Sequence, residues 1–205
     1  GLVVAVLLLA LVAGIVVLLL HLGPADDEGG GGGGGGGGTA APTVDVANQF
    51  VRPPVAYCVH ASGRSAELAA DLDIPQIAAH IGFIPEDSGD PDYQDLARRI
   101  GEIADVCKES GLTFAFETGQ EKASTLVGFI KNLGRDNIRV NFDPANMILY
   151  GSGDPLEALD LVGPYIGGVH GKDAKWAEPD KVGKEWGTEV PLAEGDAQWE
   201  KIIVK

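Results

Sequence analysis

From about Ser65 to the end of the chain, short apolar runs alternate with segments whose apolar residues recur every three or four positions. The runs are short enough to be strands, and their continuous apolar character is typical of strands buried on both faces of a parallel sheet. We predict strands at Ile74–Phe83, Leu112–Glu117, Ile138–Asp143 and Tyr165–His170, with a less regular fifth candidate at Val55–His60.

The segments between these runs carry the start and stop signals of helices. Asp90 is a predicted N-cap with Pro91 at the first helical position, and Gly111 is a predicted stop. Asp154 and Pro155 repeat the same start for a helix that we expect to end near Val162. Two further helices are predicted, one over about Ser124–Leu133 that stops at Gly134 and one beginning in the final residues, "AQWEKIIVK". A loop is expected after His170, because the stretch that follows contains Pro179, Gly183, Gly187 and Pro191.

Alternation of strand and helix predicts an α/β protein with a parallel sheet and right-handed crossovers. Polar residues occupy the ends of successive strands: His80, Glu117, Asp143 and His170. Barrel enzymes assemble their sites from strand ends in this way, whereas a dinucleotide-binding sheet needs a glycine-rich turn after its first strand. We therefore predict a (β/α)8 TIM barrel. It is expected to be incomplete, because such a barrel needs eight strands and about 250 residues.

The N-terminal segment has a different composition. Residues 2–20 are entirely apolar, and ten consecutive glycines run from Gly29 to Gly38. About 20 apolar residues can span a bilayer, so residues 1–22 are expected to be either a transmembrane helix or a segment foreign to the mature fold. We take residues 23–42 as a flexible glycine-rich linker and residues 43–205 as the partial barrel. A cytoplasmic location is expected, with membrane anchoring as the alternative if residues 1–22 are genuine.

The charge of the chain indicates which partners it disfavours, and its cysteine content indicates the type of compartment. The chain has 15 Lys and Arg against 30 Asp and Glu, a formal net charge of -15. Nucleic-acid affinity comes largely from basic side chains that displace counterions, so a nucleic-acid partner is disfavoured. Cys58 and Cys107 form no metal-binding or disulfide pattern, which fits a reducing compartment or two buried thiols.

Three of the strand-end residues form a candidate metal site. Glu117, Asp143 and His170 would offer two carboxylates and one imidazole at one rim of the sheet. Each alone has a simpler explanation, as a solvent-facing acid, a turn residue or a structural histidine. Together they suit one divalent ion, Mn²⁺, Mg²⁺, Co²⁺ or Zn²⁺, with positions left for water or substrate.

Several motifs carry a resemblance to a known family. The segments are "AAHIGFIPED" (Ala78–Asp87), "FETGQE" (Phe116–Glu121), "NFDPANM" (Asn141–Met147), "VHGKDAKW" (Val169–Trp176) and "EVPLAEGDAQW" (Glu189–Trp199). In order and spacing they resemble the xylose isomerase-like TIM barrels, the sugar phosphate isomerases and epimerases, over about Ser65–Lys205.

The resemblance implies specific roles. Glu117, Asp143 and His170 would be metal ligands, and His80, Asn146 and Lys172 would line the sugar site. Glu117 would also be a catalytic residue that removes the proton next to a carbonyl, through a metal-stabilised enediolate, in a sugar or sugar phosphate isomerase or epimerase.

Two departures from the family pattern bear on activity. The resemblance places a second glutamate, the fourth ligand, on a last strand beyond Lys205, and Glu194 is a weak substitute for it. Ala193 stands where the family usually has glycine, so the turn would be strained if this position needs positive φ. We expect weak or no activity from the chain as given.

Other functions are also found on this type of barrel. An inosose-type dehydratase would use the same metal and the same proton abstraction, and a catalytically inactive barrel fragment is a second alternative. Endonucleases on the same barrel need more histidine ligands and a basic surface, so we disfavour them. The expected partners are a small sugar substrate and, in a homo-oligomer, further copies of the chain.

Overall fold

The structure is a computed structural model that describes residues 15–17 and 55–205, with side chains from Gly63 onward. Its strands are β1 (Ile15–Val17), β2 (Gln76–Ala79), β3 (Thr113–Glu117), β4 (Ile138–Phe142), β5 (Ile166–Val169), β6 (Asp173–Lys175) and β7 (Thr188–Val190). Its α-helices are α1 (Val55–Asp71), α2 (Pro91–Glu109), α3 (Ala123–Leu133), α4 (Pro144–Tyr150), α5 (Pro155–Val162) and α6 (Trp199–Val204), and a 3₁₀ turn, η2 (Gly163–Tyr165), precedes β5.

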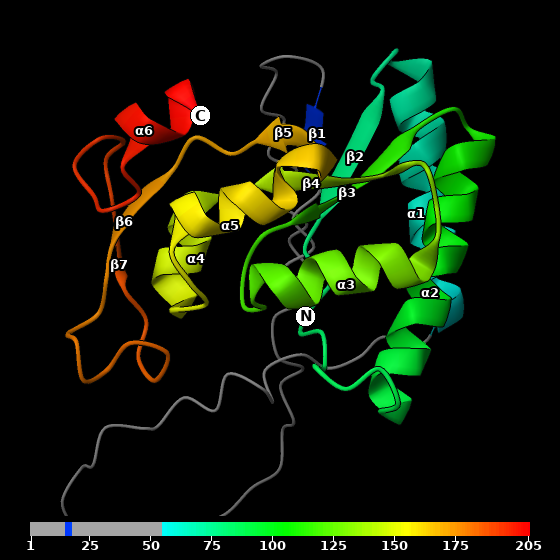
Figure 1. The fold of residues 1–205 in the computed structure, drawn as a ribbon. Coiled ribbons are helices and arrows are strands. Elements are labelled where there is room, and N and C mark those ends of the chain that lie inside the picture. The colour runs from blue at the N-terminus through cyan, green and yellow to red at the C-terminus, as the bar shows by residue number, and fades with distance from the viewer. Residues whose placement is uncertain (1–14, 18–54) are drawn as a thin grey trace, which may run out of the picture.

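Strands β1 to β5 form one parallel sheet in which every strand lies beside its predecessor in the chain. An unbroken order of this kind is the connectivity of a barrel, whereas a doubly wound sheet reverses its order at a switch point. The helices also contact one another in chain order, α1 with α2, α2 with α3, and α3 with α5 (Figure 1). The described part is thus an arc of strands with an outer layer of helices.

The sheet is strongly curved. Gln76 on β2 and Gly167 on β5 are separated by two strands, yet a Cβ built on Gly167 would collide with Oε1 of Gln76. Gln76 also lies against β3, because Oγ1 of Thr113 is 3.1 Å from the same oxygen. The side chain of Gln76 therefore reaches the backbone of a non-adjacent strand across the concave face, as side chains do inside a barrel.

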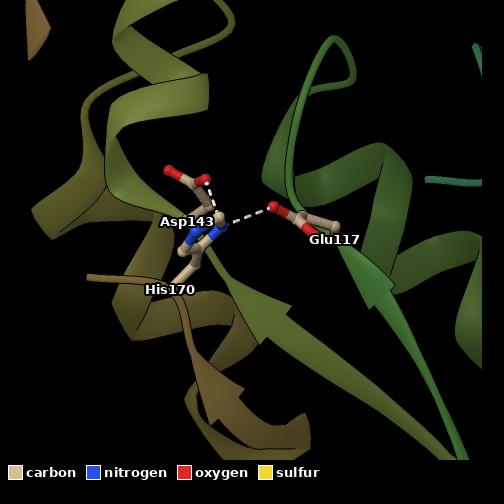
Figure 2. A group of neighbouring side chains, drawn as sticks. All are labelled: Glu117, Asp143 and His170. Atoms are coloured by element: carbon tan, nitrogen blue, oxygen red, sulfur yellow. Dashed lines mark hydrogen bonds and ion pairs between the residues drawn. The ribbon is translucent and has the colours of Figure 1, made fainter. Parts of the chain in front are cut away.

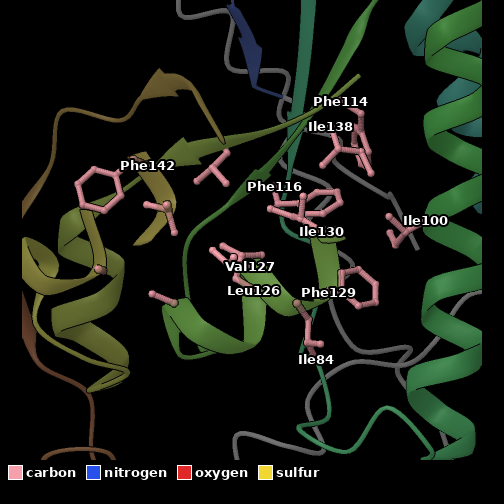
Figure 3. Close-up of a cluster of buried hydrophobic side chains, with 14 of the residues drawn as sticks. Ile84, Ile100, Phe114, Phe116, Leu126, Val127, Phe129, Ile130, Ile138 and Phe142 are labelled. Carbon is pink, nitrogen blue, oxygen red and sulfur yellow. The ribbon is translucent and has the colours of Figure 1, made fainter. Parts of the chain in front are cut away.

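The convex face of the sheet carries the hydrophobic core. Phe114 and Phe116, two positions apart on β3, both point toward the helices and pack edge to face with ring centroids 5.5 Å apart (Figure 3). Phe116 also contacts Phe129 of α3, which in turn packs edge to face against Tyr93 of α2. Because alternate side chains of a strand face opposite ways, this packing directs Glu117 to the concave side.

The capping signals of the sequence are confirmed at three helices. The side chain of Asp90 accepts a hydrogen bond from the backbone N–H of Asp92 at the start of α2, and Asp154 caps α5 in the same way. α3 ends at Gly134, whose φ of 61° is the left-handed conformation that glycine adopts readily.

Three expectations about secondary structure were wrong or incomplete. Val55–His60 is not a strand but the first part of α1, which packs against α2. The strand expected over Ile74–Phe83 is limited to β2, which follows Pro75. The loop expected after His170 contains the antiparallel pair β6 and β7.

Of the N-terminal residues 1–42, the structure describes residues 15–17. Ile15–Val17 form β1 beside β2, so these three residues are a strand and not part of a helix. The remainder of residues 1–22, and the linker at 23–42, lie outside the described residues. Among residues 15–17 and 55–205, no helix combines the length and apolar character needed to cross a bilayer.

Candidate metal and substrate site

Three neighbouring strands deliver the predicted ligands to one point. Glu117 is the last residue of β3, Asp143 directly follows β4, and His170 directly follows β5. One ligand atom from each lies within 4.8 Å of the others. Figure 2 shows the three side chains pointing toward one another. The parallel strands cause this convergence, because their carboxyl ends meet at the same edge of the sheet.

Both carboxylates are buried and face the same ring nitrogen. Nδ1 of His170 is 2.8 Å from Oε1 of Glu117 and 3.1 Å from Oδ2 of Asp143 (Figure 2). The side chains of Glu117 and Asp143 are 3% and 0% exposed, and Oδ2 of Asp143 has no well-directed hydrogen bond. A buried carboxylate oxygen without a directed hydrogen bond would be satisfied by a cation, so these residues fit a divalent ion.

The electrostatics of the group point the same way. The close contacts with the carboxylates of Asp143 and Glu117 outweigh burial and raise the pKa of His170 to about 9. Burial alone would raise the pKa of Glu117, but the hydrogen bond with His170 and the charges of His80 and His170 lower it overall. A proton on His170 thus occupies the position between the carboxylates that a metal ion would take.

Hydrogen bonds to the backbone hold Asp143 in place. Oδ1 of Asp143 accepts from the backbone N–H of Asn146 at 2.9 Å, so this aspartate is also the N-cap of α4. The hydroxyl of Thr118 donates to the carbonyl of Asp143 at 2.9 Å and accepts from its backbone N–H at 2.7 Å. Sequence reasoning missed Thr118; its place directly after a ligand at a strand end was the one signal available.

The three residues expected to line the sugar site all lie around this group. Nε2 of His80, which follows β2, is 3.8 Å from Oε1 of Glu117. The side-chain amide of Asn146 donates to the carbonyl of Thr118 at 3.2 Å and lies 3.5 Å from Glu117. Nζ of Lys172 is 3.4 Å from Oδ1 of Asn146 and 3.8 Å from Oδ2 of Asp143. Their role toward a substrate stays a prediction.

Two more residues bind this group and were not predicted to belong to it. Glu189 on β7 pairs with Nζ of Lys172 at 2.9 Å and so orients that ammonium group. The amide of Asn141, which faces the concave side from β4, lies 3.5 Å from Oε2 of Glu117. The site residues were predicted from polar side chains at the ends of strands of the main sheet. Neither Glu189 nor Asn141 has such a position, so neither was predicted.

Asp173 organises the loop that follows the site. Its buried carboxylate accepts hydrogen bonds from the backbone N–H groups of Ala174, Ala193 and Ala197, at 2.9, 3.0 and 3.1 Å. Ala193 has a φ of 69°, so this position does need the conformation that favours glycine. Glu194 is exposed and is not part of the three-ligand group in the described residues.

Comparison with known proteins agrees with this geometry. Residues 59–205 match the family model described as "Xylose isomerase-like TIM barrel". The chain belongs to this family, and the expected resemblance and fold class are confirmed.

Three solved structures are similar to the chain. A xylose isomerase domain protein from Planctomyces limnophilus is 42% identical, with a TM-score of 0.70 over 72% of this chain and 53% of that one. A xylose isomerase-like TIM barrel protein from Mycobacterium smegmatis, in complex with magnesium, is 19% identical, with a TM-score of 0.59 over 71% of this chain and 54% of that one. An L-ribulose 3-epimerase is 20% identical, with a TM-score of 0.51 over 72% of this chain and 48% of that one.

The chain spans about half the length of these three structures. At the identities of the last two, the likeness bears on the fold alone.

Proposed function

We propose that the protein is a metal-dependent sugar isomerase or epimerase. The observation that carries this proposal is the convergence of Glu117, Asp143 and His170 at three neighbouring strand ends, with two carboxylates buried around one imidazole. These three residues would hold one divalent ion. When bound there, such an ion would act as a Lewis acid on adjacent carbonyl and hydroxyl oxygens of a sugar.

The residues of the chain would divide the remaining work. Glu117 would remove the proton from the carbon next to the carbonyl, and its lowered pKa keeps it in the basic form that this step needs. Lys172 and Asn146 present an ammonium group and an amide beside Asp143, where sugar hydroxyls could be held. His80, which follows β2, lies beside Glu117 on the side away from β4. Return of the proton to the other face gives epimerisation, and return to the neighbouring carbon gives isomerisation.

Metal binding is the first test of the proposal. Titration calorimetry with Mn²⁺, Mg²⁺ and Co²⁺ should show one site, and Asp143→Asn should weaken the affinity at least tenfold. Glu178→Gln, which changes an exposed acid outside the site, should leave it unchanged. Equal metal affinity in the wild type and Asp143→Asn would rule out the site.

Proton abstraction is the second test. With the metal present, D-fructose in D₂O should exchange hydrogen at the carbon next to the carbonyl, and Glu117→Gln should abolish the exchange. Loss of water from a cyclic polyol ketone, without exchange of fructose, would instead indicate a dehydratase. Metal binding without either reaction would indicate an inactive barrel.

A cytoplasmic location is part of the same proposal. Cys107 is an unpaired, buried thiol, and burial raises its pKa to about 11, so it stays an inert core residue. A free thiol of this kind fits a reducing compartment.

A further inference from the structure

An aromatic cavity lies beside the candidate metal site. Its volume is about 210 Å³, and three aromatic side chains, Phe83, Tyr150 and Trp186, form much of its wall. Gln120, Lys184 and Glu185 add polar groups. Phe83 and Trp186 are each about half exposed, at 54% and 51%, so a ligand in the cavity could reach both residues.

Tyr150 and Gly119 connect this cavity to the metal site. Tyr150 ends α4, the helix that begins at Asp143. A Cβ built on Gly119 would lie 3.7 Å from both His80 Nδ1 and a ring carbon of Tyr150, so the two rings border the same side of Gly119. Burial raises the pKa of Tyr150, and the nearby carboxylates of Asp143 and Glu117 add to the rise while Lys172 opposes it. The phenol is therefore close enough to the metal site to be influenced by its charges.

The aromatic wall is held in a defined position. The rings of Tyr150 and Trp186 meet edge to face, with centroids 5.0 Å apart and planes at 70°. Next to Trp186, the backbone N–H of Gly187 donates to the carbonyl of Leu149 at 2.9 Å, and a Cβ on Gly187 would collide with the carbonyl of Lys175. The segment that carries Trp186 is thus fastened directly to α4 and β6.

The charges of the wall favour an uncharged ligand. Nζ of Lys184 donates to the backbone carbonyl of Asp180 at 3.0 Å, and Glu185 pairs with Lys181 at 3.0 Å. Both charges of the cavity are already engaged, and they are of opposite sign. A phosphate group would meet Glu185 as well as Lys184, whereas sugar hydroxyls could use both.

We propose that the aromatic cavity binds the second ring of an uncharged sugar substrate whose keto ring lies at Glu117, Asp143 and His170. The apolar face of a sugar ring presents C–H groups, which pack well against the electron-rich faces of aromatic rings. A cavity of about 210 Å³ is smaller than the roughly 300–1,000 Å³ of a complete ligand pocket, which suits one part of a larger ligand. This inference rests on the proposed function and narrows its substrate class.

The test compares a one-ring and a two-ring ketose on the full chain. D-fructose and lactulose, which is a galactosyl-substituted fructose, are examined by saturation-transfer NMR without added metal. The galactosyl protons should receive saturation from the wild type and from Leu161→Ala, an exposed apolar change on α5 outside the cavity. Trp186→Ala should remove this saturation and weaken lactulose binding about tenfold, the effect of one lost ring contact, while fructose affinity stays the same.

Phe83→Ala is the second variant, because Phe83 is exposed and lies on a separate segment from Trp186. It should weaken lactulose binding severalfold. Unchanged lactulose binding in both folded variants, or no saturation of the galactosyl ring in the wild type, would overturn the proposal. A parallel Mn²⁺ titration distinguishes failure of this inference from failure of the proposed function. Metal binding without galactosyl contact refutes only the sugar-binding role of the cavity, whereas absence of metal binding refutes the proposed function.

Discussion

Nδ1 of His170 lies 2.8 Å from Oε1 of Glu117. His170 follows β5 and Glu117 ends β3, and β4 lies between these two strands. Asp143 at the end of β4 completes the group from the intervening strand. The curvature of the sheet favours this contact, because in a flat sheet the ends of β3 and β5 would be about 10 Å apart. The curvature that is typical of a barrel therefore also helps to bring the three candidate ligands together.

This relationship predicts that metal binding releases a proton. The pKa of His170 is raised to about 9, so the metal-free protein carries a proton there at pH 7, whereas Glu117 has already lost its own. A metal-bound imidazole must be neutral, so Mn²⁺ should displace about one proton, and its affinity should rise about tenfold per pH unit up to about pH 9. Calorimetry in buffers of different ionisation enthalpy measures the proton count.

The matched control for this experiment is His170→Gln. It retains a polar side chain without a titrating ring, so its residual metal affinity should change little between pH 7 and 9. A wild-type affinity that is flat over the same range would show that His170 does not carry the displaced proton.

The strand-end residues could be predicted because chain order and strand direction determine where they lie. An acid or histidine at the end of each parallel strand reaches the same rim, whatever the details of packing. The Asp-Pro starts and the glycine stop at Gly134 act through local backbone geometry, so they were also readable. Both kinds of signal depend on neighbours in the sequence.

The features that were missed depend on contacts between distant residues. Val55–His60 is a short apolar run, and periodicity alone does not distinguish such a run from a helix. Packing of α1 against α2, with Ala66 and Ala69 buried, accompanies the helical form. β6 and β7 are short and polar, and the buried carboxylate of Asp173 at the start of β6 binds backbone groups about 20 residues away.

Glu121 is predicted to lower the stability of the protein at neutral and higher pH. It is 7% exposed, and burial raises its pKa to about 7 despite backbone hydrogen bonds. The pKa of this carboxyl group is higher in the folded protein than its unfolded value of 4.5. The free energy of unfolding therefore decreases as pH rises from 4.5 through 7. Glu121→Gln should therefore stabilise the fold by about 3 kcal/mol at pH 8 and by about 1 kcal/mol at pH 5.

Thermal denaturation at the two pH values measures this difference. A gain of about 3 kcal/mol corresponds to roughly 6–12 °C for a domain of this size. Glu67→Gln, a change at an exposed acid on α1, should show no such dependence. An equal effect of Glu121→Gln at pH 5 and pH 8 would contradict the raised pKa.

Ala193→Gly should stabilise the loop after β7. Ala193 has a φ of 69°, a conformation that costs a residue with a Cβ roughly 1–2 kcal/mol. Glycine removes this strain but increases the entropy of the unfolded chain by about 0.4–1 kcal/mol, so the net gain should be about 0.5–1 kcal/mol. Urea denaturation measures it. Ala177→Gly, a loop position that is not among the residues of positive φ, should destabilise instead.

Asp173 is predicted to be the main structural support of residues 193–197. Its 1% exposed carboxylate accepts three backbone hydrogen bonds, and Gly195 packs so closely against it that a Cβ there would collide with Oδ1. Asp173→Ala would leave buried N–H groups without acceptors and should cost about 3 kcal/mol. Asp173→Asn keeps the shape and one oxygen, so it should cost about half as much. Hydrogen exchange should show faster exchange at the amides of Ala193 and Ala197 in both variants, with Phe114 on β3 unaffected. Unchanged exchange at Ala193 and Ala197 would mean that the loop is held by other contacts.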